Sequence, residues 1–202
     1  MAGSAYLMTL VIVNGESVAN DSRRRMVEGA AALMGTRGLN ATSFSDVLAE
    51  SGAPRGSIYF HFPGGKRELA KDAMNWTSEQ VIAHMTASSA STAFDVVHNF
   101  VALFHHVVGA SDGAAGCAVA GVTIDVAAGD DELLSVARGA FHAWAELLGG
   151  QLRAVGVPEE RAAGIAVIAV ASVEGALILC RAEGGVGPLD AVEAQLLRLV
   201  EA

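Results

Sequence analysis

Glycine and proline divide the stretch from residue 35 to 66 into segments so short that only small helices and tight turns fit between them. A capping-box pattern opens a helix at Ser43, and Gly52 ends that helix. Pro54 suits the first turn of the next helix, which Pro63-Gly64-Gly65 soon stops. The pattern predicts two short helices joined by a glycine turn.

Apolar residues recur at helical spacing through the rest of the chain, and no stretch shows the sustained alternation of a strand. The hydrophobic fraction of 52% is mostly Ala, Val and Leu, with only four prolines, which favours helix. We therefore predict an all-α chain. Its first helix begins at Ser22 as N-cap, and further helices are expected over about 66–86, 93–108, 117–126, 130–155, 158–183 and 188–202.

Charge is distributed unevenly. Residues 22–71 contain eight basic and four acidic residues, whereas the chain from residue 72 onward contains five basic and sixteen acidic ones. We call the basic segment the head and the acidic remainder the body. This asymmetry is expected when only the head binds phosphate groups, although chance clustering on a solvated face is the alternative. We expect a weakly ordered leader over 1–20, a DNA-binding head over 21–65 and a helical body over 66–202.

Two apolar stretches raise the question of a membrane. Residues 5–13 are too short to span a bilayer, and no basic residue precedes them. Residues 164–180 approach a spanning length but are rich in Ala and Gly and include Glu174. We interpret them as a helix buried between protein surfaces, and we expect no membrane partner. Cys117 and Cys180 show no metal spacing or disulfide framework, which favours a reducing cytoplasm.

The Gly65-Lys66 pair also raises the possibility of a nucleotide-binding loop. That pattern needs a glycine at position 60, which is Phe60, and a hydroxyl residue after the lysine, where Arg67 stands. No predicted strand precedes the loop. The nucleotide interpretation therefore fails.

A helix-turn-helix fits the same stretch better, with Gly52 as the turn. Arg55 and Ser57 are placed to contact bases, and Gly56 lets the backbone approach closely. The predicted phosphate contacts are Tyr59, His61 and Lys66. In the preceding helix, Arg25 either contacts phosphate or belongs to a solvated helix start.

The run TSFSDVLAESGAPRGSIYFHFPGGKRELAKDAM closely resembles the DNA-binding domain of TetR/AcrR-type transcriptional regulators. The resemblance covers residues 22–75 and includes Thr42 and Ser43 at the helix start, which we add to the DNA contacts. The loop before the lysine is one residue longer than usual, and Leu48 stands where many members have alanine. These features, with GAPRG and the later Gly116-Cys117, resemble the LmrA/YxaF-like branch.

The resemblance implies a three-helix DNA-binding domain with a helix-turn-helix and a larger helical domain for ligand binding and dimerisation. It implies a homodimer that binds a palindromic double-stranded operator, most simply as a repressor, and a small hydrophobic effector that releases it. The last two helices would form the dimer interface, and their apolar stripes fit that role. The predicted interface residues are Ile165, Ser172, Gly175, Leu179, Val192, Leu196 and Leu199.

Candidate effector-binding residues recur on apolar faces of the middle helices, although each one also fits a plain core. They are Phe100, Phe104, His105, Val122, Asp125, Phe141, Trp144, Ile168 and Glu174. A carboxylate in apolar surroundings needs a partner, so Asp125 and Glu174 suggest a cationic or hydroxylated ligand, with a helix cap or internal salt bridge as the alternative.

Two other classes of function remain open at this point. A helical carrier protein could retain the head without operator specificity. An enzyme is disfavoured because no nucleophile–base pair or pair of catalytic carboxylates stands out. No cofactor is expected, and His98, His105 and His106 lack the further ligands of a metal site.

Overall fold

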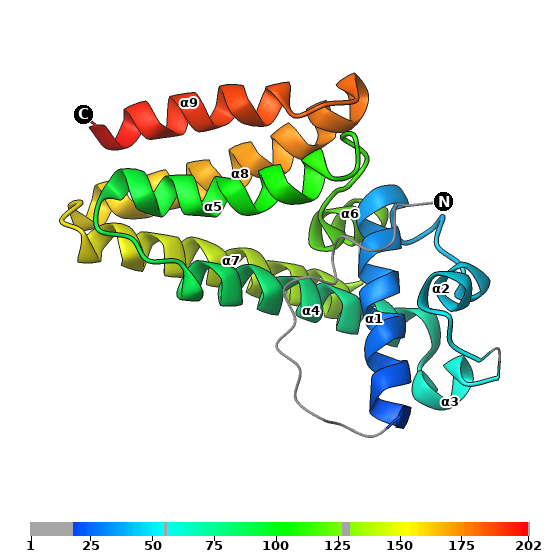
Figure 1. The fold of residues 1–202 in the computed structure, drawn as a ribbon. Coiled ribbons are helices and arrows are strands. Elements are labelled where there is room, and N and C mark those ends of the chain that lie inside the picture. Colours follow the sequence, from blue (N-terminus) through cyan, green and yellow to red (C-terminus); the bar gives the residue numbers. More distant parts are fainter. Residues whose placement is uncertain (1–17, 55, 127–129, 202) are drawn as a thin grey trace. The chain divides into compact units, whose positions relative to one another are not determined.

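The structure, a computed structural model, describes residues 18–54, 56–126 and 130–201, and only the backbone of residues 18–20 (Figure 1). Within these ranges it is helical and has no strand, so the predicted all-α class is confirmed. The helices are α1 (Val18–Arg37), α2 (Phe44–Ser51), α3 (Ile58–His61), α4 (Gly65–Ala87), α5 (Ala93–Gly109), α6 (Ala118–Asp125), α7 (Asp131–Ala154), α8 (Glu159–Glu183) and α9 (Gly187–Glu201).

The chain forms two compact units that do not follow the order of the sequence. Unit 1 holds the described residues up to Thr77 together with those from Gly116 to Ala137, and unit 2 holds the remainder. Helices α4 and α7 each cross from one unit to the other. Because α6 packs against α1, a segment from the middle of the chain belongs with the head (Figure 1).

Helices α1 and α6 meet backbone to backbone. A Cβ atom at Gly35 would collide with the carbonyl oxygen of Gly116, and one at Gly121 would collide with the carbonyl oxygen of Met34. Neither position can therefore hold a side chain unless the helices separate. This close approach fixes α6 along the last turns of α1.

The start of α1 differs from the prediction. The helix begins at Val18, so Ser22 is a buried interior residue and its assignment as N-cap is wrong. Asp21 lies in the first turn, where the helix dipole favours a carboxylate. Residues 1–17 of the predicted leader lie outside the described residues, whereas residues 18–20 form the start of α1.

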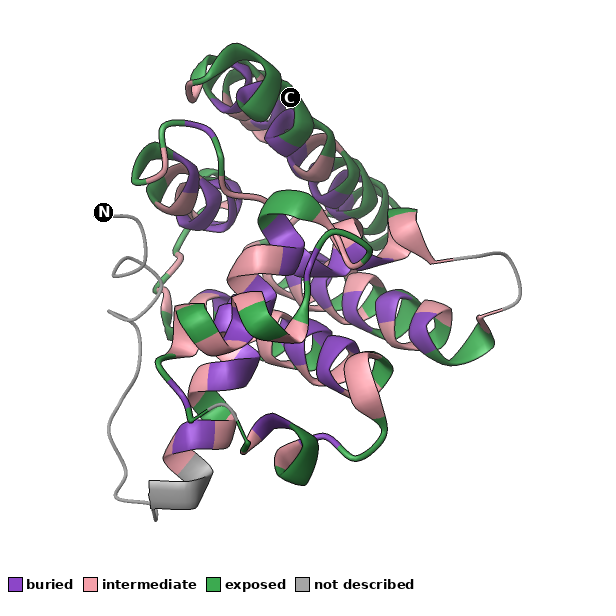
Figure 2. Cartoon of the chain, turned by 90° about the vertical axis from the view of Figure 1, so that its right-hand side faces the viewer, coloured by how far each residue is buried: buried purple, intermediate pink, exposed green. Residues whose placement is uncertain are grey.

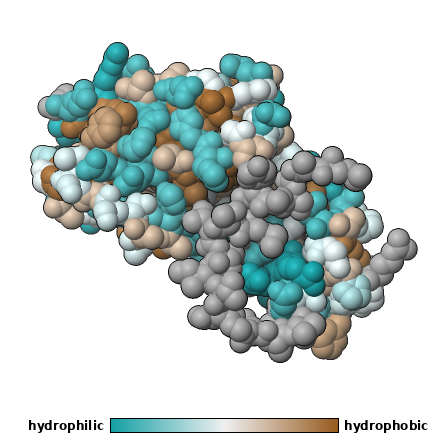
Figure 3. All heavy atoms as spheres, viewed as in Figure 1, coloured by the Kyte–Doolittle hydropathy of each residue, from teal (hydrophilic) through white to brown (hydrophobic). Residues whose placement is uncertain are grey.

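Unit 2 is built from α5, α8 and α9, which pack against one another, together with the remainders of α4 and α7. Buried residues recur along these helices between exposed ones (Figure 2). Phe100, Trp144 and Leu189 are among the fully buried ones, and the Trp144 Nε1–H donates to Ser78 Oγ at 3.1 Å. On the face shown in Figure 3, hydrophilic and hydrophobic side chains are mixed over α5 and α9.

Among the described residues, α8 alone is long and apolar enough to cross a membrane by length and composition. The core helix of a soluble protein meets the same criterion, and α8 packs against α5 and α9 within unit 2. The alternation of buried and exposed residues around α8 defines one face toward the unit and one face outward.

Candidate nucleic-acid interface

The start of α2 is fixed by the predicted capping box. The Asp46 N–H donates to Ser43 Oγ at 3.2 Å, and the Ser43 N–H donates to Asp46 Oδ2 at 2.9 Å. Hydrogen bonds from Ser43, reinforced by nearby Arg37, lower the pKa of the Asp46 carboxyl. Gly52 ends the helix in the left-handed conformation at φ 63°, so both predicted boundaries of α2 are confirmed.

The second helix of the motif begins later than predicted. The Ser57 N–H donates to the Pro54 carbonyl at 3.0 Å, and regular helix starts only at Ile58. Ile58 and, directly after the helix, Phe62 are fully buried. These two side chains lie four residues apart and anchor α3 to unit 1.

The anchoring turns the middle of α3 outward. Tyr59 is 70% exposed and Phe60 is 80% exposed. The Tyr59 ring packs edge-to-face against Phe44 of α2, with centroids 5.4 Å apart, and Phe60 packs similarly against His61 at 5.2 Å. Phe60 was missed in the sequence, although the inward positions of Ile58 and Phe62 require the residues between them to face out.

The other predicted DNA contacts have more varied surroundings. Gly56 is exposed, with open space where a Cβ atom would lie, and Ser57 Oγ donates to the Pro54 carbonyl at 2.7 Å. Thr42 is buried, and its hydroxyl donates to the Gly38 carbonyl at 2.7 Å. Arg55 lies outside the described residues.

Lys66, in the first turn of α4, is held beside the α1–α2 loop. Its Nζ donates to the carbonyl oxygen of Asn40 at 3.2 Å. Just before α4, the Gly64 N–H donates to the Glu68 carboxylate at 2.8 Å. Free amides at a helix start favour an anion, and the Glu68 carboxylate of the chain itself lies there.

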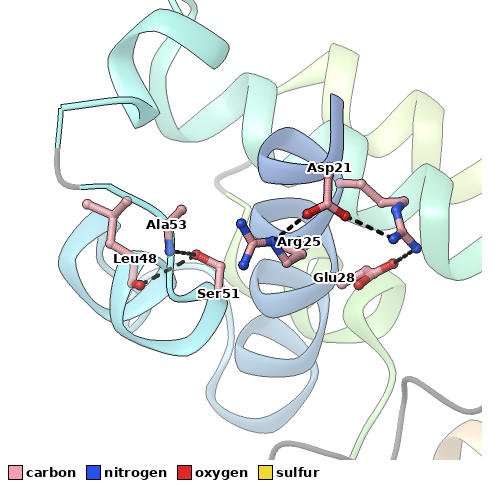
Figure 4. A network of polar contacts seen from close by, with 7 residues as sticks. Asp21, Arg25, Glu28, Leu48, Ser51 and Ala53 are labelled. Atoms are coloured by element: carbon pink, nitrogen blue, oxygen red, sulfur yellow. Dashed lines mark hydrogen bonds and ion pairs between the residues drawn. The ribbon is translucent and has the colours of Figure 1, made fainter. Parts of the chain in front are cut away.

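Arg25 belongs to a network on α1 (Figure 4). The Asp21 carboxylate pairs with Arg25 Nε and with Arg24 Nη2, each at 3.2 Å, and Arg24 also pairs with Glu28. The Arg25 side chain extends toward Ser51 and the end of α2 (Figure 4). Burial raises the pKa of the Glu28 carboxyl above its ordinary value.

The basic head is largely neutralised by acidic groups. Unit 1 carries eight basic and eleven acidic residues, because the returning segment 116–137 adds acids to it. Each described basic residue of 22–71 has an ion pair or hydrogen bond. The pairs are Arg23 with Asp72, Arg24 with Asp21 and Glu28, Arg25 with Asp21, Arg37 with Asp46, Lys66 with the Asn40 carbonyl, Arg67 with Asp130 and Glu132, and Lys71 with Glu132.

Two of these cations join the starts of α4 and α7. Arg67 binds the Asp130 carboxylate through both terminal nitrogens, and Lys71 Nζ lies 2.9 Å from Glu132 Oε1. The hydrogen bond from Arg67 lowers the pKa of Asp130, and the bond from Lys71 lowers the pKa of Glu132. These contacts are surface-exposed, so solvent screens them.

The candidate effector residues are divided between the units. Val122 and Asp125 lie on α6 in unit 1, and the others lie in unit 2. Phe100 packs edge-to-face on Phe104, as Phe141 does on Trp144. His105 Nε2 lies 3.2 Å from Glu193 Oε2, and both carboxylate oxygens of Glu174 are buried. Ile168 is an exposed residue on the outer face of α8.

The predicted dimer residues face different ways. Ile165 and Leu196 are buried within the unit, Ser172 and Val192 are half-buried, and Gly175, Leu179 and Leu199 are exposed. Val167 and Ile178, large apolar residues that the sequence did not assign to this surface, are exposed on α8, as is Ile168. The α8 outer face is the set of these exposed α8 residues: Gly164, Val167, Ile168, Ala171, Gly175, Ile178 and Leu179.

Two family models match the chain in tandem. Residues 26–73 match the model described as bacterial regulatory proteins, tetR family, and residues 93–195 match the C-terminal domain of LmrA/YxaF-like transcriptional regulators. Both bear out the resemblance that the sequence motifs indicated.

Named relatives match over most of their lengths. The HTH-type transcriptional regulator Rv0196 of Mycobacterium tuberculosis is 36% identical over 185 residues, which cover 88% of this chain and 93% of that protein. The HTH-type transcriptional regulator LmrA of Bacillus subtilis is 29% identical, covering 79% and 86%.

Solved structures have the same fold. A TetR transcriptional regulator from Chloroflexus aurantiacus superposes with a TM-score of 0.73 at 26% identity, covering 91% of this chain and 96% of that one. A second, from Legionella pneumophila, gives a TM-score of 0.79 at 22% identity, covering 93% and 100%.

Proposed function

The chain belongs to the TetR family of transcriptional regulators, and from this premise we propose that it is a ligand-responsive repressor that binds a palindromic operator as a homodimer. A small hydrophobic effector releases it from DNA. The relatives are regulators and not enzymes, so we assign the chain no reaction. Its place of action is the cytoplasm, where the DNA lies.

The observation that carries the proposal is the exposed face of α3. Two large aromatic side chains of α3 face solvent, although Ile58 before them and Phe62 after the helix are buried, and such an exposed apolar surface marks a site of interaction. Tyr59 can donate a hydrogen bond to a phosphate, and the Phe60 ring can contact a thymine methyl group in the major groove. Ser57 and Gly56 precede this face in the sequence, and we expect them to enter the groove with it, together with Arg55.

The α8 outer face supports the proposed dimer. It combines large aliphatic residues with exposed small ones, Gly164, Ala171 and Gly175, at helical spacing. Small residues allow the helices of two subunits to approach closely, and burying the aliphatic ones against a second copy removes them from water. Leu199 on α9 extends the same surface in our proposal, and a two-fold dimer matches a palindromic operator.

The proposed effector site lies among the aromatic residues of unit 2. Phe100, Phe104, Phe141 and Trp144 supply an apolar lining, and Glu174 supplies a buried carboxylate for a cationic or hydroxylated group on the ligand. We leave Val122 and Asp125 out of this site because they belong to unit 1.

The deciding experiment measures binding to a labelled duplex that contains the DNA upstream of the chain's own gene. We expect tight binding that weakens steeply with salt, and losses of about tenfold or more for Arg55→Ala and Tyr59→Ala. Phe94→Ala, an exposed aromatic of α5 in unit 2, is the matched control.

Two results would contradict the proposal. Unchanged affinity in both variants would show that α3 is not the DNA-reading element. Equal affinity for the upstream duplex and for a mixed-sequence duplex of the same length would favour a helical carrier protein without operator specificity.

A further inference from the structure

Asp125 is the last residue of α6, a position where the helix disfavours a negative charge. A carboxylate at the C-terminal end of a helix faces the negative end of the helix dipole. Its partner lies instead in the α1–α2 loop, where the Asn40 N–H donates to Asp125 Oδ2 at 2.8 Å. The Asn40 side-chain amide also donates to the Asp125 carbonyl at 3.4 Å. The Asp125 carboxylate therefore stabilises the α1–α2 loop rather than the end of α6.

The loop is shaped to receive this carboxylate. Gly38 has a φ of 80°, and a Cβ atom there would collide with Asp125 Oδ2, so the loop approaches the acid as closely as a glycine allows. The Thr42 hydroxyl closes the loop from its other end by donating to the Gly38 carbonyl at 2.7 Å. Both ends of the loop are thereby fixed relative to α6.

The same peptide then reaches Lys66. The Asn40 N–H is bound by Asp125, and the Asn40 carbonyl accepts from Lys66 Nζ at 3.2 Å. Three groups from α6, the α1–α2 loop and the start of α4 thus form one chain of hydrogen bonds through a single backbone residue. Hydrogen bonds in such a chain polarise one another, which strengthens each of them.

We propose that Asp125 is a positioning residue for DNA binding, which acts through the Asn40 backbone to hold the Lys66 ammonium where it meets a phosphate. The inference rests on the proposed function, because it requires that Lys66 contacts the DNA backbone. It adds a residue that touches no DNA and that the sequence suggested for the effector site. It also makes the position of α6 along α1 a determinant of where the Lys66 charge lies.

Asp125→Ala tests the proposal in the full-length protein with the labelled upstream duplex. Removing a negative charge from the head should strengthen binding if only long-range electrostatics acted. The proposal expects the opposite: affinity falls by about tenfold, which is the effect of mispositioning one charged hydrogen-bonding group. The slope of log affinity against log salt should become shallower by up to about one, toward that of Lys66→Ala.

A double-mutant cycle separates positioning from a general loss of structure. If Asp125 acts through Lys66, the Asp125→Ala/Lys66→Ala double variant binds DNA as Lys66→Ala does, within about twofold. Additive losses would overturn the proposal, as would Asp125→Ala with wild-type affinity and salt slope. If Lys66→Ala binds DNA with wild-type affinity, the phosphate contact in the proposed function is wrong as well. If Lys66→Ala binds more weakly but Asp125→Ala binds as the wild type does, only the positioning role of Asp125 is overturned.

Three further variants sharpen the test. Asp131→Ala removes the same charge from unit 1 at an exposed position and should not weaken binding. Asn40→Ala keeps the backbone N–H and carbonyl and should bind nearly as the wild type does. Asp125→Asn keeps an accepting oxygen and should restore most of the affinity. If Asp125→Ala lowers the melting temperature, the cycle is repeated well below the melting temperatures of all its variants, and an absence of coupling there overturns the proposal.

Discussion

Helices α3 and α8 both present large hydrophobic side chains to solvent, but they do so with different chemistry. The four residues of α3 present two aromatic rings, Tyr59 and Phe60, beside the imidazole of His61. The α8 outer face presents aliphatic residues separated by glycine and alanine. Aromatic groups with polar neighbours suit a wet, charged partner such as DNA, whereas aliphatic and small residues suit close packing against another helix.

The two helices also expose these residues for different reasons. On α3 the burial of Ile58 and Phe62 leaves the intervening residues no inward position. On α8 apolar residues occur all around the helix, so the packing of α5 and α9 decides which of them remain outside. The exposed face of the short helix therefore follows from its own few residues. The exposed face of the long apolar helix depends on which helices pack against it.

The largest effect is expected from Leu179→Glu on the α8 outer face. In a two-fold dimer the substitution occurs twice and places charges against apolar surface, so the dimer dissociation constant should rise by about a hundredfold or more. Sedimentation equilibrium measures it. Phe94→Glu, which adds the same charge at another exposed apolar position in unit 2, is the control. A wild-type constant for Leu179→Glu would place the dimer contact elsewhere.

A smaller effect is expected from Phe60→Ala on α3. Affinity for the upstream duplex should fall by about fivefold to tenfold, because the apolar contact with bases is lost. The salt slope should stay the same, since a phenyl ring neutralises no phosphate. Fluorescence anisotropy at several salt concentrations checks both points, with Lys66→Ala as the contrast. A shallower slope in Phe60→Ala would show that the whole helix had moved.

The smallest effect concerns the ion pairs that join α4 and α7. The hydrogen bond from Arg67 lowers the pKa of Asp130 in the folded chain, so its contribution to stability is complete above the unfolded pKa of about 4 and is lost as pH falls through the lower folded value. Asp130→Asn should slightly lower the urea midpoint at neutral pH and flatten its decline below about pH 4. Asp131→Asn is the control. Identical acid profiles for Asp130→Asn and the wild type would contradict the prediction.

Local patterns predicted the features of the head that depend on neighbouring residues. The capping box at Ser43 and the stop at Gly52 follow from a few adjacent positions. The later start of α3 could not be predicted from the sequence, because proline suits both a tight turn and the first turn of a helix. The pairing of Arg67 with Asp130 was also hidden, since only the fold brings residues 63 positions apart together.

The stripes on the last helices show a second limit. Ile165 and Leu196 were expected at the dimer interface and are buried within unit 2, while Ile168, expected at the effector site, faces outward on α8. Periodicity identifies a face only where polar residues mark its opposite side. Because α8 has few such residues, its sequence predicts a buried helix without indicating which side meets which partner.

The backbone contact between α1 and α6 has a practical consequence for building hybrid regulators. A fusion that joins this head to the body of a relative at residue 65 would supply the head with a foreign α6. Any residue larger than glycine at the site of Gly121 would then strike the carbonyl of Met34. A working hybrid would need residues 116–125 of this chain transplanted into the foreign body, so the exchangeable module is discontinuous.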